Sequence, residues 1–495
     1  PTTETELNRT FPFAATQVHR RSDWLTTVKG YSKYVWDFET NGSENWYGRN
    51  QSFGQLSIYS GRDLDGIVTA EASAVGYDGY DWTHIPGTTV PNLSLAEVLA
   101  DAKNFQWPRF SNEAFASGVT DGKNGAYGFK FSDRTKGQSS STWVKPKLTA
   151  LKSYFFFDDL IVTLGSDIDN TASSYDTHTT IFQNLLPSPD TPIQINGENI
   201  TGLSYSQDLT TENPATLTDI AGNGYYIANA KGLHIQRSTQ ESMDDKNKNA
   251  TSGDYATVWI NHGSQINNGT YEYAVWVRGG EYISELASDP DKFYIIERQD
   301  NIAHIVTHGQ TKGLTIFTEN TDIEDKYIHQ TSEPCLIWID SENEDISLTV
   351  ANPDLGYYEK GNEFGQFPIQ AWSVPASKQY LESEIEPVEV IINGKWDILD
   401  TNEKVENQGY DPANNTTTLR FNGINAESLS VKLSSLNTGI DFFSKENNIS
   451  VYPNPTTGKL FIDLAQPIES NIRITDISGR EVLSIPANNR KNISI

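Results

Sequence analysis

The side chains with the clearest potential for chemistry gather in the first 60 residues. This stretch holds six basic and six acidic residues, so the net charge of −28 arises entirely downstream of it. The basic and aromatic residues concerned are Arg9, Arg20, Arg21, Lys29, Lys33, Arg49, Trp24, Tyr31, Tyr34, Trp36, Trp46 and Tyr47. Cations bind acidic groups, and flat rings stack on the faces of sugars. The mixture suits an acidic polysaccharide, although an ordinary sheet face with aromatic packing has the same composition.

Metal-binding and nucleophilic motifs are missing from the sequence. His304 and His308 have i,i+4 spacing, but AHIVTHG is typical of a strand, where four residues span roughly 13 Å, too far for one ion. The one cysteine, Cys335, cannot form an intrachain disulfide or a cysteine cluster. GxSxG, HExxH and P-loop motifs do not occur. We therefore expect no metal, no cofactor and no self-contained nucleophile–base pair in this chain.

Charge and hydropathy narrow the class of protein. A net charge of −28 argues against a nucleic-acid binder, whose surface is basic. No run of about 18 apolar residues occurs, so we expect no membrane span. Hydrophobic residues make up 36% of the chain and aromatic residues 11%, which is enough to build cores. A length of 495 residues suggests about three domains.

The elements that must position these residues are predicted to be strands. Apolar residues alternate with polar ones in EDISLTV (344–350), TTLRF (417–421) and LSVKL (429–433), the period of half-buried antiparallel strands. Asn393-Gly394, between VEVII and KWDI, predicts a hairpin turn. A capping box at Ser94 and Glu97 predicts a helix over residues 94–105, and a short helix is expected near Ser284. The sequence thus predicts an almost all-β protein of stacked sheets.

Ordered motifs along the chain carry a resemblance to a known family. VHRRSDWLTTVKGYSKYVWDFETNGSENWYGRNQSFG (18–54) resembles the start of the C-terminal β region of polysaccharide lyase family 8, and is most similar to its chondroitin sulfate ABC lyases. The motifs that follow in the family's order are YDWTHIPGTT (80–89), KSYFFFDDLIVTLGSDI (152–168), TTIFQN (179–184), GNGYYI (222–227), VWINHG (258–263), TYEYAVWV (270–277) and NPDL (352–355). The resemblance covers roughly residues 10–435.

The resemblance implies a fold and a domain order. We expect a large antiparallel multi-sheet super-sandwich, galactose-mutarotase-like, over residues 1–325, and a smaller C-terminal β-sandwich over 326–438. In the family an α/α toroid precedes this region and carries the catalytic His, Tyr and Arg. None of that domain is expected in this chain, so the chain is interpreted as a fragment that is inactive by itself.

One catalytic position of the family falls in this sequence. The glutamate that reaches the active site from the β side corresponds to Glu39. Relatives often have an Asn three residues later, where this chain has Gly42, with Asn41 one residue earlier. The residues predicted to bind substrate near this position are Asn41, Asn45, Trp46, Tyr47 and Arg49.

The resemblance also implies a reaction. The family cleaves hexosamine–uronate links by β-elimination, giving 4,5-unsaturated uronate products. The uronate carboxylate must be neutralised so that a Tyr, helped by His, can take the C5 proton. A buried Glu, the role assigned to Glu39, orients the Arg and Tyr, and this logic requires no metal. Chondroitin or dermatan sulfate is the expected substrate. Hyaluronan, another uronate polymer, or a non-catalytic carbohydrate-binding or adhesion protein stay open as alternatives, and the sequence upstream of Pro1 would separate them.

The end of the chain resembles a different module. The polar residues 439–449 are expected to be a linker. VYPNPTTGKLFIDL (451–464) and IRITDISGREVL (472–483) are similar to the type IX secretion sorting domain of Bacteroidota, expected here as a truncated β module over 450–495. This resemblance implies export by the type IX machinery to the cell surface or the extracellular space.

Overall fold

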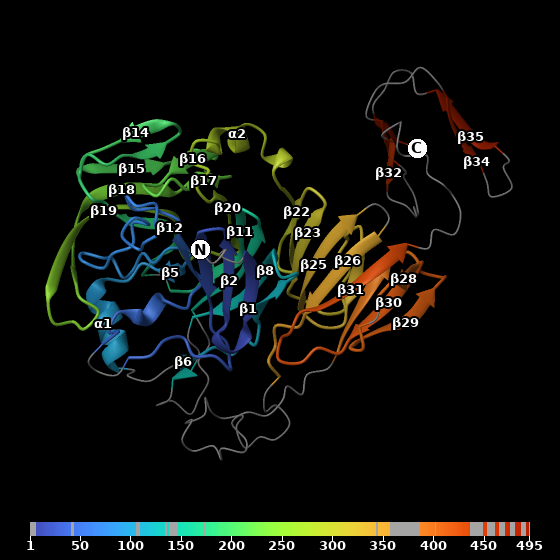
Figure 1. Ribbon diagram of the computed structural model, residues 1–495, viewed down its shortest axis with the longest axis horizontal. Helices are drawn as coiled ribbons and strands as arrows, with labels where there is room; N and C mark the ends of the chain where they lie inside the picture. Colours follow the sequence, from blue (N-terminus) through green and yellow to red (C-terminus); the bar gives the residue numbers. More distant parts are fainter. Residues whose placement is uncertain are drawn as a thin grey trace, which may run out of the picture. The chain divides into compact units, whose positions relative to one another are not determined.

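A computed structural model shows that the chain is built from antiparallel strands, as the sequence predicts (Figure 1). The structure describes residues 6–40, 44–104, 109–133, 136–137, 147–172, 174–342, 345–356, 387–400, 402–435, 449–452, 461–464, 471–475, 481–486 and 492–494. The chain divides into two compact units, Pro1–Leu436 and Asn437–Ile495. The helices are short and few among these residues, and none of them has the length and apolar character needed to cross a bilayer.

Three sheets make up the first part of the larger unit. The nine-stranded sheet has the order β14 (Glu198–Ile200), β13 (Ile193–Ile195), β16 (Ala215–Thr218), β17 (Gly224–Ile227), β20 (Gly269–Trp276), β11 (Leu160–Asn170), β10 (Leu148–Phe157), β8 (Gly125–Ser132) and β7 (Ala116–Thr120). The five-stranded sheet has the order β15 (Tyr205–Leu209), β18 (Leu233–Met243), β19 (Ala250–Ser264), β12 (Asp176–Leu185) and β5 (Thr89–Pro91). The four-stranded sheet consists of β1 (Leu7–Phe11), β2 (Thr16–Arg21), β3 (Trp24–Lys29) and β4 (Gln55–Tyr59).

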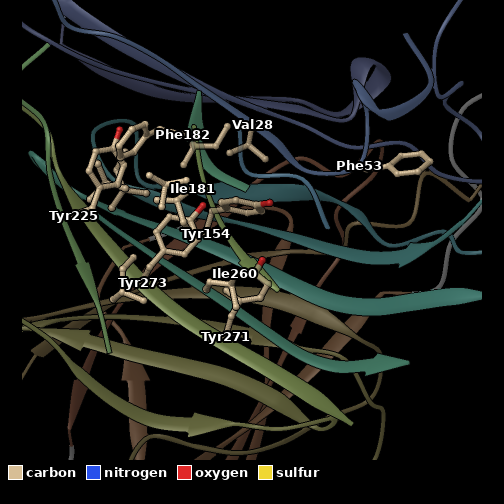
Figure 2. Packing of buried hydrophobic residues seen from close by; sticks show 14 of the residues in the cluster. Val28, Phe53, Tyr154, Ile181, Phe182, Tyr225, Ile260, Tyr271 and Tyr273 are labelled. Carbon is tan, nitrogen blue, oxygen red and sulfur yellow. The ribbon is translucent and has the colours of Figure 1, made fainter. Parts of the chain in front are cut away.

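One hydrophobic core joins these three sheets. It takes Val28 from β3, Tyr154 from β10, Phe182 from β12 and Tyr273 from β20, all of them buried (Figure 2). Burying one such side chain contributes about 1.5–3 kcal/mol. The core therefore fixes the sheets relative to one another, and with them the loops that run between strands of different sheets.

A second sandwich follows in the same unit. Its seven-stranded sheet has the order β21 (Ile295–Gln299), β22 (Ala303–His308), β23 (Thr311–Ile316), β25 (Cys335–Glu342), β26 (Asp345–Ala351), β31 (Leu429–Ser435) and β28 (Trp396–Ile398). Its four-stranded sheet has the order β24 (Ile328–Thr331), β27 (Val388–Asn393), β30 (Thr416–Phe421) and β29 (Val405–Asp411). The strands β26, β30 and β31 confirm the three alternating segments of the sequence.

The pairing of β21–β23 bears on where this sandwich begins. β23 pairs with β25, so these three strands belong to the later sheet although they end at Ile316. We propose that the C-terminal sandwich begins near Pro290, at the short helix η3 (Pro290–Lys292), rather than at residue 326. Its sheet packs on the nine-stranded sheet through Phe157 and Trp338, whose ring centroids lie 5.1 Å apart.

The hairpin predicted at Asn393-Gly394 is wrong. β27 pairs with β24 and β30 in the four-stranded sheet, whereas β28 pairs with β31 in the seven-stranded sheet. Gly394 has a φ of +93°, so the turn itself forms where the sequence predicts it. The turn therefore carries the chain from one sheet of the sandwich to the other.

The remaining elements are short. The predicted helices are confirmed as α1 (Leu95–Asn104) and α2 (Ile283–Ser288), and two 3₁₀ turns are η1 (Pro12–Ala14) and η2 (Gly48–Asn50). β6 (Arg109–Phe110) pairs with β9 (Lys136–Gly137). The second unit contains the three-stranded sheet β32 (Ile449–Tyr452), β33 (Phe461–Leu464) and β36 (Asn492–Ser494), and the pair β34 (Asn471–Thr475) and β35 (Glu481–Pro486).

Candidate active site

Glu39, expected from the sequence to be a buried carboxylate, is instead exposed in this chain and lines a hollow of about 740 Å³. We call this the acidic hollow, and its lining residues are Glu39, Glu44, Asn45, Gln51, Tyr77, Asp78, Trp82, Asp244 and Asp245. Five of the nine carry a carboxyl group, and within this described lining there is no Lys, Arg or His. The sequence-predicted catalytic carboxylate thus stands at a concave surface beside four further carboxyl groups, with Lys246 acting on one of them, Asp244.

Asn45 holds the loop that carries Glu39. Its Nδ2 donates to the backbone carbonyl of Glu39 at 2.8 Å and to Oε1 of Gln51 at 3.2 Å. Asn45 has a φ of +56°, a conformation that Asn adopts more readily than most residues. A Cβ on Gly48 would lie 2.5 Å from the Asn45 side chain, so a larger residue there would displace that amide. Asn45 therefore positions Glu39 by a direct bond, besides lining the hollow.

Trp46 and Tyr47 tie the same loop to the turn between β18 and β19. The backbone N–H of Trp46 donates to the carbonyl of Asp245 at 2.8 Å. The Tyr47 hydroxyl donates to Oδ1 of Asn247 at 2.7 Å, and its ring is buried. Burial, with a contribution from Asp244, raises the pKa of Tyr47. A phenol that is harder to ionise is a poor general base, so Tyr47 supports the site without supplying the base.

Three aromatic rings form a column at the hollow, which we call the ring column. Tyr47 stacks on Trp82 with centroids 6.0 Å apart, and Trp82 stacks on Tyr77 at 5.7 Å with an angle of 4° between the planes. Nε1 of Trp82 donates to the carbonyl of Met243 at 3.0 Å. Trp82 belongs to the YDWTHIPGTT motif of the sequence. Tyr77 was not singled out there, and the spacing Tyr-x-x-Tyr-x-Trp was the available signal.

Arg49 is buried away from the hollow. Its Nη2 donates to both carboxylate oxygens of Asp133 at 3.0 Å, and its Nε donates to Asp101 at 3.1 Å. Burial lowers the pKa of the guanidinium, but Asp133 and Asp101 outweigh this and raise it above the ordinary value. This cluster, the Arg49 clamp, joins η2 to α1 and to the end of β8. The side chain is 8% exposed, so the geometry gives Arg49 a structural role here, while contact with substrate stays a sequence prediction.

Buried polar groups support the loops beneath the hollow. Nζ of Lys152, on β10, donates to the carbonyls of Phe53 at 2.9 Å and Gly87 at 2.7 Å, and the Tyr154 hydroxyl donates to the carbonyl of Gly54 at 2.8 Å. Burial holds the pKa of Lys152 well below its ordinary value. These bonds connect the segment that carries Glu39 and η2 to the segment that follows Trp82.

The two histidines considered as metal ligands in the sequence make hydrogen bonds within the fold. The His304 ring lies between two hydroxyls, Ser153 Oγ at 2.5 Å and Ser166 Oγ at 2.8 Å, and His308 Nδ1 bonds the carbonyl of Phe293. Among the described residues, no group of three or more His, Cys, Asp or Glu side chains is arranged to hold a metal ion. Asn41 lies outside the described residues, so its predicted contact stays a prediction.

Comparison with known proteins finds one match within each of the two compact units. Residues 6–280 match the family model of the polysaccharide lyase family 8 super-sandwich domain, and residues 450–495 match that of a secretion system C-terminal sorting domain. A chondroitin sulfate ABC exolyase of Bacteroides thetaiotaomicron is 30% identical over 409 residues, covering 80% of this chain and 38% of that protein. A chondroitin sulfate ABC endolyase of Proteus vulgaris is 27% identical over 427 residues, covering 85% of this chain and 38% of that protein.

Solved structures agree on the architecture. The Streptomyces coelicolor A3 chondroitin AC lyase in complex with chondroitin sulphate aligns with a TM-score of 0.64 and 17% identity, over 87% of this chain and 50% of that one. The Paenibacillus xanthan lyase aligns with a TM-score of 0.69 and 18% identity, over 100% of this chain and 48% of that one. These likenesses confirm the predicted all-β fold. The chain spans about 38% of the length of the curated relatives named above.

Proposed function

Because this chain belongs to polysaccharide lyase family 8, we propose that it is the β portion of a lyase that cleaves chondroitin or dermatan sulfate by β-elimination. The observation that carries the proposal is the placement of Glu39, exposed on a hollow large enough for sugar rings and held by Asn45. The two relatives above, whose names specify chondroitin sulfate ABC, favour this substrate over hyaluronan or xanthan.

The reaction needs groups of opposite charge around the uronate. A base takes the proton from C5, the C4–O bond to the leaving sugar breaks, and the freed oxygen receives a proton. The electron pair of the C5–H bond becomes the C4–C5 double bond of the product. An enolate-like intermediate becomes accessible only when hydrogen bonds and a cation neutralise the uronate carboxylate.

The acidic hollow supplies one part of this arrangement. It offers carboxylates and no cation among its described lining residues, so it cannot neutralise a uronate by itself. We assign the Tyr, His and Arg of the reaction to the family's α/α domain, outside this chain. Glu39 is assigned the role of orienting that Arg and Tyr: Asn45 holds its backbone at the hollow, and a carboxylate beside a cation balances its charge and directs its hydrogen bonds.

The sorting domain extends the proposal to localisation. The chain carries a secretion-system C-terminal sorting domain over residues 450–495. We infer that the type IX system of a Bacteroidota bacterium exports the protein to the cell surface or beyond. An exported enzyme would meet a polymeric substrate outside the cell.

Product analysis tests the proposed activity. The complete protein, including its α/α domain, is incubated with chondroitin sulfate, and the products are examined for the ultraviolet absorbance of unsaturated uronate ends. The proposal expects these ends from the complete protein and none from the 495-residue chain alone. Binding of the polymer without any unsaturated ends from the complete protein would favour the alternative, a non-catalytic carbohydrate-binding protein.

A further inference from the structure

Tyr77 presents an aromatic face at the acidic hollow that the proposed reaction does not use. One face of its ring is covered by Trp82, with the two planes nearly parallel. Tyr77 is nevertheless 57% exposed, which places it among the most exposed large side chains of the described residues. Tyr80 meets the ring at its edge, at a centroid distance of 5.5 Å and an angle of 66°. The exposed surface therefore includes the face opposite Trp82.

The ring is held in place before any ligand arrives. The chain after it turns at Gly79, whose φ is +77° and whose N–H donates to Thr251 Oγ1 at 3.0 Å. A Cβ at Gly79 would lie 2.2 Å from the backbone N of Gly253, so β19 packs directly against this turn. Because folding has already fixed the turn after Tyr77 and stacked the ring on Trp82, a ligand that binds the ring costs little further conformational entropy of the protein.

We propose that Tyr77 is a stacking platform for the hexosamine ring of the polysaccharide, on the acidic hollow that also holds Glu39. This inference rests on the proposed function, since it names a subsite of that substrate. The apolar C–H face of a sugar stacks on an exposed aromatic ring, as flat apolar surfaces do. The platform lies beside carboxylates, so it favours the uncharged sugar of the alternating polymer and disfavours the uronate.

The same carboxylates are expected to disfavour a sulfated hexosamine. Asp78 follows Tyr77 in the chain, is exposed, and lines the hollow together with Glu44 and Asp245. A sulfate on the stacked hexosamine would enter the hollow that these carboxylates line, and like charges in water repel over about a Debye length, roughly 8 Å. Repulsion from one carboxylate about 4–8 Å away in water weakens binding by roughly 2- to 5-fold at low salt, and salt reduces this effect. We therefore expect the platform to take an unsulfated hexosamine in preference to a sulfated one.

Binding of defined oligosaccharides tests the platform directly. The affinity of the 495-residue chain for an unsulfated chondroitin tetrasaccharide is measured by saturation-transfer NMR. Tyr77→Ala is expected to weaken binding about 3- to 10-fold, the range of an aromatic stacking contact. Tyr77→Phe keeps the ring and is expected to bind like the original chain. Tyr282→Ala is the matched control, because Tyr282 is 50% exposed and packs on Trp276 outside the hollow.

The charge preference has its own variant. Asp78→Asn is expected to reduce the difference in affinity between unsulfated and sulfated tetrasaccharides. Asp65→Asn, on another exposed loop, is expected to leave this difference in affinity unchanged. Unchanged binding in Tyr77→Ala, or no binding by the original chain, overturns the platform. Product analysis of the complete protein is independent of this result. Unsaturated ends together with unchanged oligosaccharide binding by Tyr77→Ala would reject the stacking platform and support the lyase activity. Weakened binding by Tyr77→Ala without unsaturated ends would support the stacking platform and reject the lyase activity.

Discussion

Replacing Arg49 by Met separates the structural role seen in the Arg49 clamp from the substrate contact predicted from the sequence. Met keeps most of the apolar stem that packs near Phe53, where the guanidinium lies 5.5 Å from the ring centroid. The substitution removes the cation that pairs with Asp101 and Asp133, whose side chains are only 22% and 13% exposed. Two largely buried carboxylates then lose the guanidinium that they contact.

The expected cost follows from that arrangement. Removing one partner of a buried ion pair costs about 3–5 kcal/mol, because the remaining charge is desolvated and uncompensated. We expect the free energy of unfolding of the first unit to fall by about this amount in Arg49→Met. Adding Asp101→Asn and Asp133→Asn to the same variant is expected to recover part of the loss, because neutral amides are cheaper to bury than carboxylates.

Urea unfolding followed by tryptophan fluorescence is a suitable assay. All 11 Trp residues precede residue 437, so the signal reports the first unit alone. Arg62→Met is the control: its ion pair with Asp23 is 2.6 Å long but the Arg62 side chain is 51% exposed, and such pairs contribute less than about 1 kcal/mol. A loss below 1 kcal/mol in Arg49→Met, together with lost oligosaccharide binding by folded protein, would refute the structural role and support the substrate contact.

Three further predictions concern pH, a close backbone approach and export. Burial lowers the pKa of His304 to about 3. Below pH 6.5 this side chain therefore binds a proton in the unfolded state but not in the folded state. Unfolding free energy should therefore fall from pH 6.5 to 5, and urea titrations of His304→Gln should show a decrease smaller by about 2 kcal/mol. Gly87→Ala should destabilise more than Gly66→Ala in the same assay: both have positive φ, but a Cβ at Gly87 would lie 2.5 Å from Leu56 N, whereas Gly66 has open space. Deleting residues 450–495 should keep the complete protein in the periplasm of its host, and equal extracellular activity of both forms contradicts this.

Local patterns in the sequence predict where strands form but not which strands pair with one another. Alternation with a period of two predicts β26, β30 and β31, because each residue's face depends only on its neighbours along the strand. The hairpin at Asn393-Gly394 was wrong because the pairing of β27 and β28 depends on strands far away in the chain. The turn residues specify the bend, while the two cores decide which sheet each strand joins.

The same limit applies to the candidate site. Glu39 could be placed through a family motif, and the structure puts it on a hollow. The role of Arg49 could not be read, because Asp101 and Asp133 lie 52 and 84 residues further along the chain. The spacing Tyr-x-x-Tyr-x-Trp marks Tyr77 as part of an aromatic group, but it does not show that Trp82 stacks on the ring or that the ring stays exposed, since both depend on the folded structure.

The central claim, that Glu39 serves the chemistry of a polysaccharide lyase, is tested most directly by steady-state kinetics of Glu39→Gln in the complete protein. Gln keeps the size of the side chain and removes its charge. Losing one charge-assisted hydrogen bond costs about 1.5–3 kcal/mol. We therefore expect kcat on chondroitin sulfate to fall about 10- to 100-fold, with a smaller change in KM and an unchanged thermal melt. An unchanged kcat with an unchanged melt would contradict the account and remove Glu39 from the active site.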